Sequence, residues 1–161
     1  MKRKKKRPAH EHLPGMRTMR CPYCKRPVII RSAKGIYNKY AEGVQLLVCS
    51  GYPACDAYVR IHSGTTTPVG SLANKQLRAL RQKAHNQFNK LYQKGLMSKD
   101  DAYSWLAYIL NVPKAQAHIG YLGNYYCQVV IEESRKLLEQ RGTGRSDRRQ
   151  LPKVTGGEPY A

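Results

Sequence analysis

The spacing of hydrophobic positions changes near residue 70 and divides the chain into two folded parts. Before this point, short apolar and β-branched runs alternate with turn residues, at Val28–Ile30, Val44–Val48 and Tyr58–Val59. Runs of this kind, bounded by Gly, Pro and polar residues, are typical of β-strands. The first part is therefore predicted to form a small β-structure.

Beyond this point, apolar positions recur three and four residues apart, which is the period of amphipathic helices. We expect a first helix with Ser71 as its N-cap and Gly95 at its end. Ser98 is the expected N-cap of a second helix, which ends before Pro113. A third helix is expected from there to about Gln140. The expected apolar faces are, in order, Leu77, Leu80, Ala84, Phe88 and Leu91; Ala102, Tyr103, Leu106 and Leu110; and Ile119, Leu122, Tyr126, Val129, Val130 and Leu137.

Two glycines give the start of the third helix a second interpretation. Gly120 and Gly123 each lower helix propensity by about 1 kcal/mol relative to alanine, but they also permit a close approach between helices. Alternatively, the stretch AQAHIGYLGNYY is a turn between two shorter helices, as in a helix-turn-helix. Because few cations lie on this stretch, we favour a packing role over nucleic-acid recognition.

Composition adds a large excess of positive charge. The 161-residue chain has 29 Lys and Arg against 10 Asp and Glu, a formal net charge of +19. This imbalance favours a polyanionic partner, nucleic acid above all. No apolar run approaches the roughly 20 residues that cross a membrane, and no apolar signal segment follows the basic N-terminus. We therefore expect a cytoplasmic protein with no membrane partner.

Four of the five cysteines form two close pairs in the first part of the chain. Cys21 and Cys24 are separated by two residues in CPYC, and Cys49 and Cys55 by five in VCSGYPAC. In a reducing compartment, such cysteines are metal ligands more often than disulfides. Four thiolates complete a zinc tetrahedron without an open position, so we expect one structural Zn²⁺ that stabilises the small ribbon. Iron–sulfur ligation or a redox pair are the alternatives.

Together these features predict an α+β protein in four segments. Residues 1–19 are expected to form a disordered basic tail, and residues 20–70 a small β zinc ribbon with four cysteine ligands. Residues 71–140 are expected to form a three-helix bundle. Residues 141–161, rich in Gly, Pro and charge, are expected to be a flexible tail.

Cations and tyrosines are interleaved around the cysteines. Cations can contact phosphates while tyrosine rings stack on unpaired bases, so single-stranded DNA is the expected partner. The alternative is that some tyrosines only cover the thin core of the ribbon. The predicted nucleic-acid-binding residues are Tyr23, Lys25, Arg26, Arg31, Tyr52, Tyr58, Arg60, Lys75 and Arg78. The basic side of the first helix comprises Lys75, Arg78, Arg81, Lys83, Lys90 and Lys94.

The cysteine motifs resemble the C-terminal zinc ribbons of bacterial DNA topoisomerase I. CPYC and VCSGYPACDAYV match their C-P-x-C and C-S-x-Y-P-x-C motifs over about residues 20–60. Those ribbons bind single-stranded DNA, and some contact RNA polymerase, so the resemblance implies partners of both kinds. The remaining residues could not hold the cleavage domain of a topoisomerase.

A second resemblance covers about residues 19–140. The ribbon followed by GSLANKQLR, GLMSKDDAYSWLA and AQAHIGYLGNYYCQVVIEES is similar to a zinc-finger-containing family of bacteriophages and mobile elements of Gram-positive bacteria. This resemblance implies the two-part architecture and a bacterial host cell, but no activity.

Catalytic motifs do not accompany the zinc motif. The chain lacks GxxxxGK[ST], G-x-S-x-G and HExxH, and its acidic residues form no convincing carboxylate pair. Cys127 is interpreted as a small buried residue, and His85 and His118 as packing residues or phosphate contacts. We therefore expect a non-enzymatic nucleic-acid-binding accessory protein with no small-molecule substrate. The alternatives are an adaptor for a host protein, such as RNA polymerase or a defence factor, and a nuclease.

Overall fold

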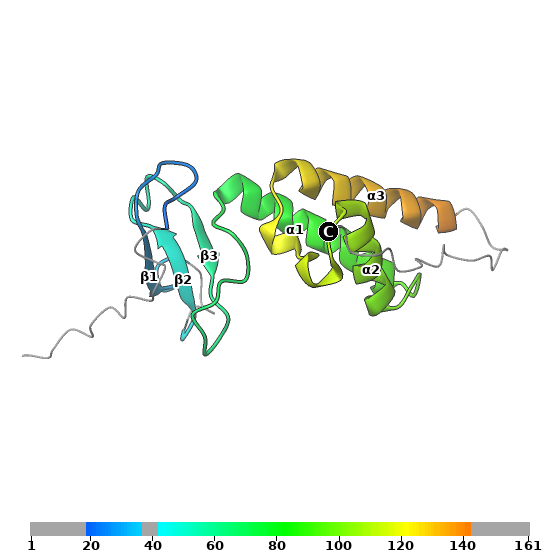
Figure 1. Cartoon of the computed structure of the whole chain (residues 1–161), viewed down its shortest axis with the longest axis horizontal. Helices are drawn as coiled ribbons and strands as arrows, with labels where there is room; N and C mark the ends of the chain where they lie inside the picture. The colour runs from blue at the N-terminus through cyan, green and yellow to red at the C-terminus, as the bar shows by residue number, and fades with distance from the viewer. Residues whose placement is uncertain (1–18, 37–41, 143–161) are drawn as a thin grey trace, which may run out of the picture.

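The computed structural model describes residues 19–36 and 42–142, which fold into two parts (Figure 1). Within these residues, a three-stranded antiparallel sheet precedes three α-helices and two short 3-10 helices. The predicted α+β class is confirmed, with the cysteine cluster in the part that holds the sheet. Both predicted tails lie outside the described residues except at their inner ends.

The sheet pairs its strands in chain order, β1 (Val28–Ser32), β2 (Gln45–Cys49) and β3 (Tyr58–Arg60). The register sets Val28 opposite Cys49. Because side chains alternate between the faces of a sheet, the two faces carry separate clusters. The buried members of the larger cluster are Cys21, Val28, Leu47, Cys49, Ala57, Val59, Ile61 and Leu72. Those of the smaller cluster are Ala33, Leu46 and Val48.

Helix α1 (Lys75–Gln93) begins later than expected. Its N-cap is Asn74, whose side-chain oxygen accepts a backbone N–H of the first turn at 2.9 Å. Ser71, the predicted cap, lies instead in the linker, residues 61–74 between β3 and α1, where its carbonyl accepts a hydrogen bond from Arg81. Gly95 follows the end of the helix with a φ of 70°, a left-handed conformation that glycine adopts without strain.

Helix α2 (Lys99–Leu110) is capped as expected. The Ser98 hydroxyl accepts the Asp101 N–H at 3.0 Å, and Asp100 and Asp101 lie in the positively polarised first turn. Asn111 ends the helix in the left-handed conformation, with a φ of 53°.

The expected third helix is interrupted. Two 3-10 turns, η2 (Lys114–Gln116) and η3 (Ile119–Tyr121), occupy its first part, and α3 (Asn124–Gly142) begins only afterwards. The prediction of a continuous helix from Pro113 was therefore wrong. The stretch is a turn region, in agreement with the alternative interpretation.

The physical reason for the interruption is a backbone contact between two glycines. Gly120 of η3 lies against Gly70 of the linker, so closely that a Cβ on Gly70 would collide with the Gly120 carbonyl. A Cβ on Gly120 would lie 2.5 Å from the Val69 carbonyl oxygen. The close approach expected of Gly120 thus exists, but its partner is the linker and not a helix.

The helical part has its own core, centred on Phe88 of α1. This ring is fully buried, and it meets Tyr92 and Tyr103 edge-on with centroids 5.9 and 5.1 Å away. The Trp105 ring is stacked parallel to it at 6.5 Å. Among the described residues, no helix is long and apolar enough to cross a membrane.

Helix α3 runs alongside α1 and buries a narrow face against it (Figure 1). Cys127, Val130 and Ser134 are each 0% exposed, and Cys127 is thus the small buried residue that was expected. Tyr126, expected in the apolar face, is 45% exposed instead. Adjacent residues of a helix point in different directions. Cys127, the smaller side chain, therefore packs against α1, and Tyr126 does not.

Hydrogen bonds also hold the linker, on one side against the sheet and on the other against the helical part. Tyr58 of β3 and Ala73 of the linker exchange backbone hydrogen bonds at 3.1 and 3.2 Å. Arg81 of α1 donates to the Ser71 carbonyl at 2.8 Å, to the Ser71 hydroxyl at 2.7 Å and to the Leu122 carbonyl at 2.9 Å. Arg81 therefore holds the linker, α1 and the residues after η3 in one arrangement.

Candidate metal centre and nucleic-acid interface

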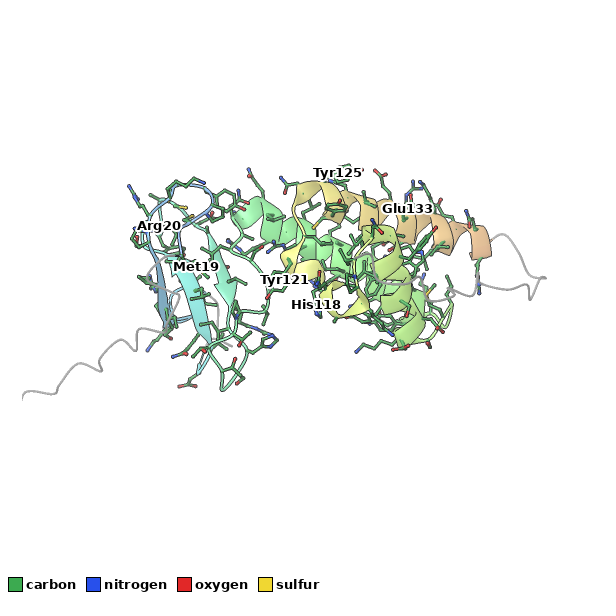
Figure 2. All side chains as sticks on the ribbon, viewed as in Figure 1. Met19, Arg20, His118, Tyr121, Tyr125 and Glu133 are labelled. Atoms are coloured by element: carbon green, nitrogen blue, oxygen red, sulfur yellow. The ribbon has the colours of Figure 1, made fainter. Side chains whose placement is uncertain are left out.

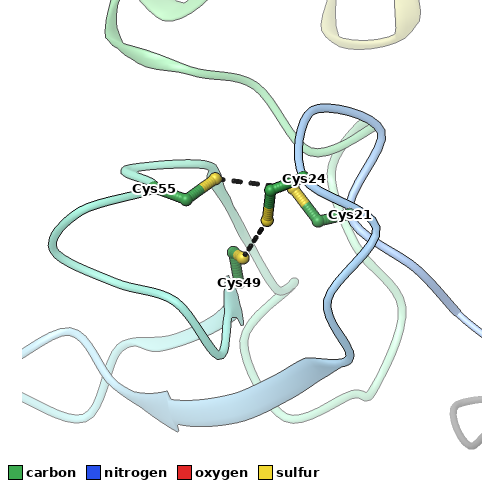
Figure 3. Close-up of side chains that lie close together, drawn as sticks. All are labelled: Cys21, Cys24, Cys49 and Cys55. Atoms are coloured by element: carbon green, nitrogen blue, oxygen red, sulfur yellow. Dashed lines mark hydrogen bonds between the residues drawn. The ribbon is translucent and has the colours of Figure 1, made fainter.

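The four paired cysteines converge on one point beside the sheet (Figure 3). Their sulfur atoms all lie within 4.8 Å of one another, with 3.6 Å between Cys21 and Cys55 and 3.3 Å between Cys24 and Cys49. A tetrahedron with Zn–S bonds of about 2.3 Å places its sulfurs about 3.8 Å apart. A disulfide would need about 2.05 Å. The spacing thus fits one zinc ion and excludes disulfides between these sulfurs.

Two tight turns bring the ligands together. In the first, the Lys25 N–H donates to the Cys21 carbonyl at 2.9 Å, and Lys25 takes a φ of 64°. In the second, Cys49 ends β2, and the Gly51 N–H donates to its sulfur at 3.4 Å. The Cys55 N–H then donates to the Gly51 carbonyl at 3.0 Å, which returns the chain to the site.

The thiols do not all ionise readily without a cation. A backbone hydrogen bond from Arg26, helped by the Cys49 side chain, lowers the pKa of Cys24 to about 7. Burial raises the pKa of Cys49 to about 12. A divalent cation favours the thiolate form of every ligand, and four thiolates around Zn²⁺ leave no position for substrate. The donor set therefore suits one structural zinc ion.

Four predicted nucleic-acid-binding residues lie on one face of the sheet. The register places Arg31 and Arg60 on either side of Leu46, and both arginines are exposed. Tyr52 and Tyr58 are half-buried and pack over the smaller sheet cluster. The two tyrosines thus cover the core, as the alternative interpretation proposed, and the arginines flank them. We call this surface, made of Arg31, Tyr52, Tyr58 and Arg60, the basic sheet face.

Arg78 is tied into the protein. Its guanidinium lies 3.7 Å from the centroid of the Tyr58 ring, pairs with the Asp56 carboxylate at 3.2 Å and donates to the Asp56 carbonyl at 2.6 Å. These contacts dock α1 on the ribbon. Lys75 is exposed nearby, and its backbone N–H donates to Asp56 at 3.1 Å.

The other three predicted contacts lie at the first cysteine turn. The Tyr23 hydroxyl accepts the Asn74 N–H at 3.2 Å, and the Lys25 ammonium donates to a carbonyl of its own turn at 3.2 Å. Arg26 lies across Gly51, where a Cβ would collide with its guanidinium. These residues surround the metal centre and do not belong to the basic sheet face.

Arg81 is a structural residue that the sequence analysis misplaced on the basic side of the first helix. It is only 8% exposed, whereas solvent-facing Lys83 is exposed. The signal was present in the sequence, because Arg81 lies four residues after Leu77 and three before Ala84, within the apolar face. Its three hydrogen bonds explain how a cation occupies that position.

A family model described as a zinc-finger-containing domain matches residues 17–137 of the chain. No curated protein and no solved structure matches. The matched range spans the metal centre and most of the helical part, so the two parts found in the fold occur together within one family.

Proposed function

The chain belongs to this family of zinc-finger-containing domains, and on that premise we propose that it binds DNA, with single strands preferred, as a non-catalytic accessory protein. The proposed role of the zinc ion is to hold the ribbon's surface in shape. The proposed setting, a bacterial host cell that carries a phage or mobile element, rests on the sequence resemblance.

The observation that carries the proposal is the basic sheet face. Arg31 and Arg60 are exposed on strands separated only by β2, which places their Cα atoms about 10 Å apart. The nearby carboxylate of Asp56 is paired with Arg78 and does not offset them. The half-buried Tyr52 ring lies 5.6 Å from the Arg31 guanidinium carbon, and cations beside an aromatic ring suit a single strand, since its phosphates and unstacked bases are both accessible.

Binding through phosphates makes a quantitative expectation about salt. Each neutralised phosphate releases counterions, so affinity falls with ionic strength. For six contacts to a single strand, affinity should fall roughly 10²- to 10³-fold between about 50 and 200 mM salt. Fluorescence anisotropy with labelled single-stranded and duplex oligonucleotides of DNA and RNA measures the affinity, the strand preference and this slope together.

A charge-matched pair of variants makes the test specific. The double variant Arg31→Ala/Arg60→Ala should lose about tenfold or more in affinity and reduce the salt slope. Arg135→Ala/Lys136→Ala removes the same charge from exposed positions on α3 and should change affinity far less. If both variants lose the same affinity, the sheet face contributes only its net charge and is not a specific site. If the protein does not bind at low salt, the proposal is refuted.

The proposed role is non-catalytic because four thiolates fill the coordination shell of the metal. Supercoiled plasmid incubated with Mg²⁺ and the protein should remain supercoiled. If the wild-type protein nicks the plasmid and a variant purified in the same way does not, the activity belongs to the protein, and this part of the proposal is contradicted.

A second candidate, an adaptor for a host protein, is favoured by one observation. Tyr125, labelled in Figure 2, is 72% exposed on α3, and its neighbour Tyr126 is 45% exposed. Their ring centroids lie 5.1 Å apart in an edge-to-face arrangement. Exposed aromatic side chains are enriched where proteins meet. Under this candidate, a host protein should remain bound after nuclease treatment of a lysate, and Tyr125→Ser should release it. Loss of the partner upon nuclease treatment would favour nucleic-acid binding instead.

A further inference from the structure

A groove of about 600 Å³ lies between the ribbon and the turn region. One wall comes from the chain that follows β3 and the other from η2 and η3. The residues that give the groove its chemistry are His62, Thr67, Pro68, Gln116, His118 and Tyr121. Figure 2 shows Tyr121 and His118 on the side of the helical part that faces the ribbon. This volume is within the range of about 300 to 1,000 Å³ of small-ligand sites.

The contacts beneath the groove fix the distance between its walls. Gly70 and Gly120 lie in backbone contact, and the Ser71 N–H donates to the Gly120 carbonyl at 3.0 Å. Arg81, which is 8% exposed, binds Ser71 on one side and Leu122 on the other. The walls are thus held by hydrogen bonds that exist before any ligand arrives, so the groove is preorganised.

The lining combines an aromatic surface with polar hydrogen-bonding groups. The Tyr121 hydroxyl donates to the Pro68 carbonyl at 3.3 Å, and the residue remains 52% exposed. The His118 ring lies 6.4 Å from it, centroid to centroid. The Gln116 amide can donate and accept. Among the lining residues that the structure describes, there is no carboxylate to repel an anionic strand.

The groove begins close to Arg60 of the basic sheet face. His62 follows Arg60 by two residues along the extended chain, and the Val69 N–H donates to the Arg60 carbonyl at 2.9 Å. A strand whose phosphates lie on Arg60 can therefore reach the groove without crossing the helical part.

We propose that this groove receives one unpaired base of the bound strand, stacked on the Tyr121 ring and hydrogen-bonded along its edge by Gln116 and the imidazoles. The inference rests on the proposed function and deepens it. The basic sheet face holds phosphates, whereas the groove holds a base. Stacking of this kind tolerates every base, because each has an aromatic face.

The test separates base binding from phosphate binding. The probe is a short oligothymidylate, compared with an abasic oligomer of the same length and charge. For the wild-type protein, removing the bases should weaken binding about tenfold or more. In Tyr121→Ala the difference in affinity between the two oligomers should become smaller, because only the other base contacts remain. Affinity for the abasic oligomer should stay unchanged. Tyr108→Ala, equally aromatic and 72% exposed on α2, should behave as the wild type.

A second pair of variants guards against a folding defect at the groove. Gln116→Ala should lower the base-dependent difference, because Gln116 is exposed and its side chain can be removed without opening a cavity. Tyr121→Phe keeps the ring and should keep the difference. If the protein binds both oligomers and neither Tyr121→Ala nor Gln116→Ala alters the difference, the groove inference is overturned while the proposed function stands. If neither oligomer binds at low salt, the proposed function itself fails.

Discussion

The zinc ligands differ in how much solvent reaches them. Cys21 and Cys49 are fully buried, Cys55 is intermediate and Cys24 is exposed. Both buried ligands belong to the larger sheet cluster, where they contact apolar side chains. The metal centre and the ribbon's core are therefore one structure, and losing a buried ligand should affect both.

Cys49→Ser should abolish stoichiometric zinc binding and unfold the ribbon. A serine hydroxyl is a poor zinc ligand, and it would be left buried without its partner ion. Metal analysis should give about one zinc per chain for the wild type and far less for the variant. Cys127→Ala is the control, since Cys127 is the one cysteine outside the cluster. Unchanged zinc content in Cys49→Ser would contradict the assignment.

Ser134 offers a residue-scale prediction in the opposite direction. It is 0% exposed on α3, and among the residues that the structure describes its hydroxyl has no hydrogen-bond partner. Ser134→Ala should therefore raise the free energy of unfolding by about 1 kcal/mol, because the cost of the unpaired group disappears. Ser104→Ala, whose hydroxyl donates to the Asp100 carbonyl at 3.1 Å, should show no such gain. Chemical denaturation measures both, and an equal gain would contradict the explanation.

Replacing Arg81 by an apolar side chain should destabilise the protein, although the position is buried. Arg81→Met leaves the Ser71 carbonyl and hydroxyl and the Leu122 carbonyl without their donor. We expect a loss of about 3 kcal/mol in the free energy of unfolding, measured by denaturation. Lys83→Met, two residues later and exposed, should cost less than about 0.5 kcal/mol. Similar effects for both variants would show that Arg81 does not act through these bonds.

At the scale of elements, local signals predicted what local interactions decide. The cap of α2 follows from Ser98 and the two aspartates after it, all within one turn. The prediction of a continuous third helix was wrong because the conformation of its first turns depends on a distant partner, the linker at Gly70. The cap of α1 was displaced for a similar reason, since Ser71 is held by Arg81 and cannot cap a helix.

Gly70→Ala tests whether that glycine contact sets the junction. Gly70 has no positive φ, so any effect of alanine comes from its Cβ, which would strike the backbone of Gly120. We expect a loss of about 1 to 3 kcal/mol in stability and chemical-shift changes on both sides of the junction. Gly123→Ala, with open space at its Cβ, is the matched control. A Gly70→Ala protein as stable as the control would contradict the role of this contact.

In the candidate site, too, the parts that depend on local sequence could be predicted, and the parts that depend on long-range contacts could not. The four cysteine ligands could be predicted because each pair closes over a short turn and the pairs share one small ribbon. Which strand residues belong to the basic sheet face can be worked out once the register is known, because side chains alternate between the two faces along each strand. The groove could not be predicted, because it joins residues near Pro68 to residues near Tyr121, and only the long-range contacts of Gly70 and Arg81 bring them together.

For the whole molecule, stability comes from two different sources. The helical part has a cluster around Phe88 that includes residues of all three α-helices. The ribbon has smaller clusters, and its larger one contains zinc ligands. A β-structure of this size buries too little apolar surface to fold alone, so the metal should determine whether it folds.

Removing the metal should therefore unfold the ribbon and leave the helices in place. After chelation, far-ultraviolet circular dichroism should retain most of the helical signal, while amide signals of the ribbon collapse to unfolded positions; added Zn²⁺ should restore them. Because zinc binds the deprotonated thiolates, protons compete with it, so this stability is present at neutral pH and is lost as the pH falls. Cys49→Ser should respond to neither chelator nor zinc. If chelation instead melts helices and ribbon in one transition, the junction through Arg78, Arg81 and Gly70 couples the two parts more strongly than their separate cores imply.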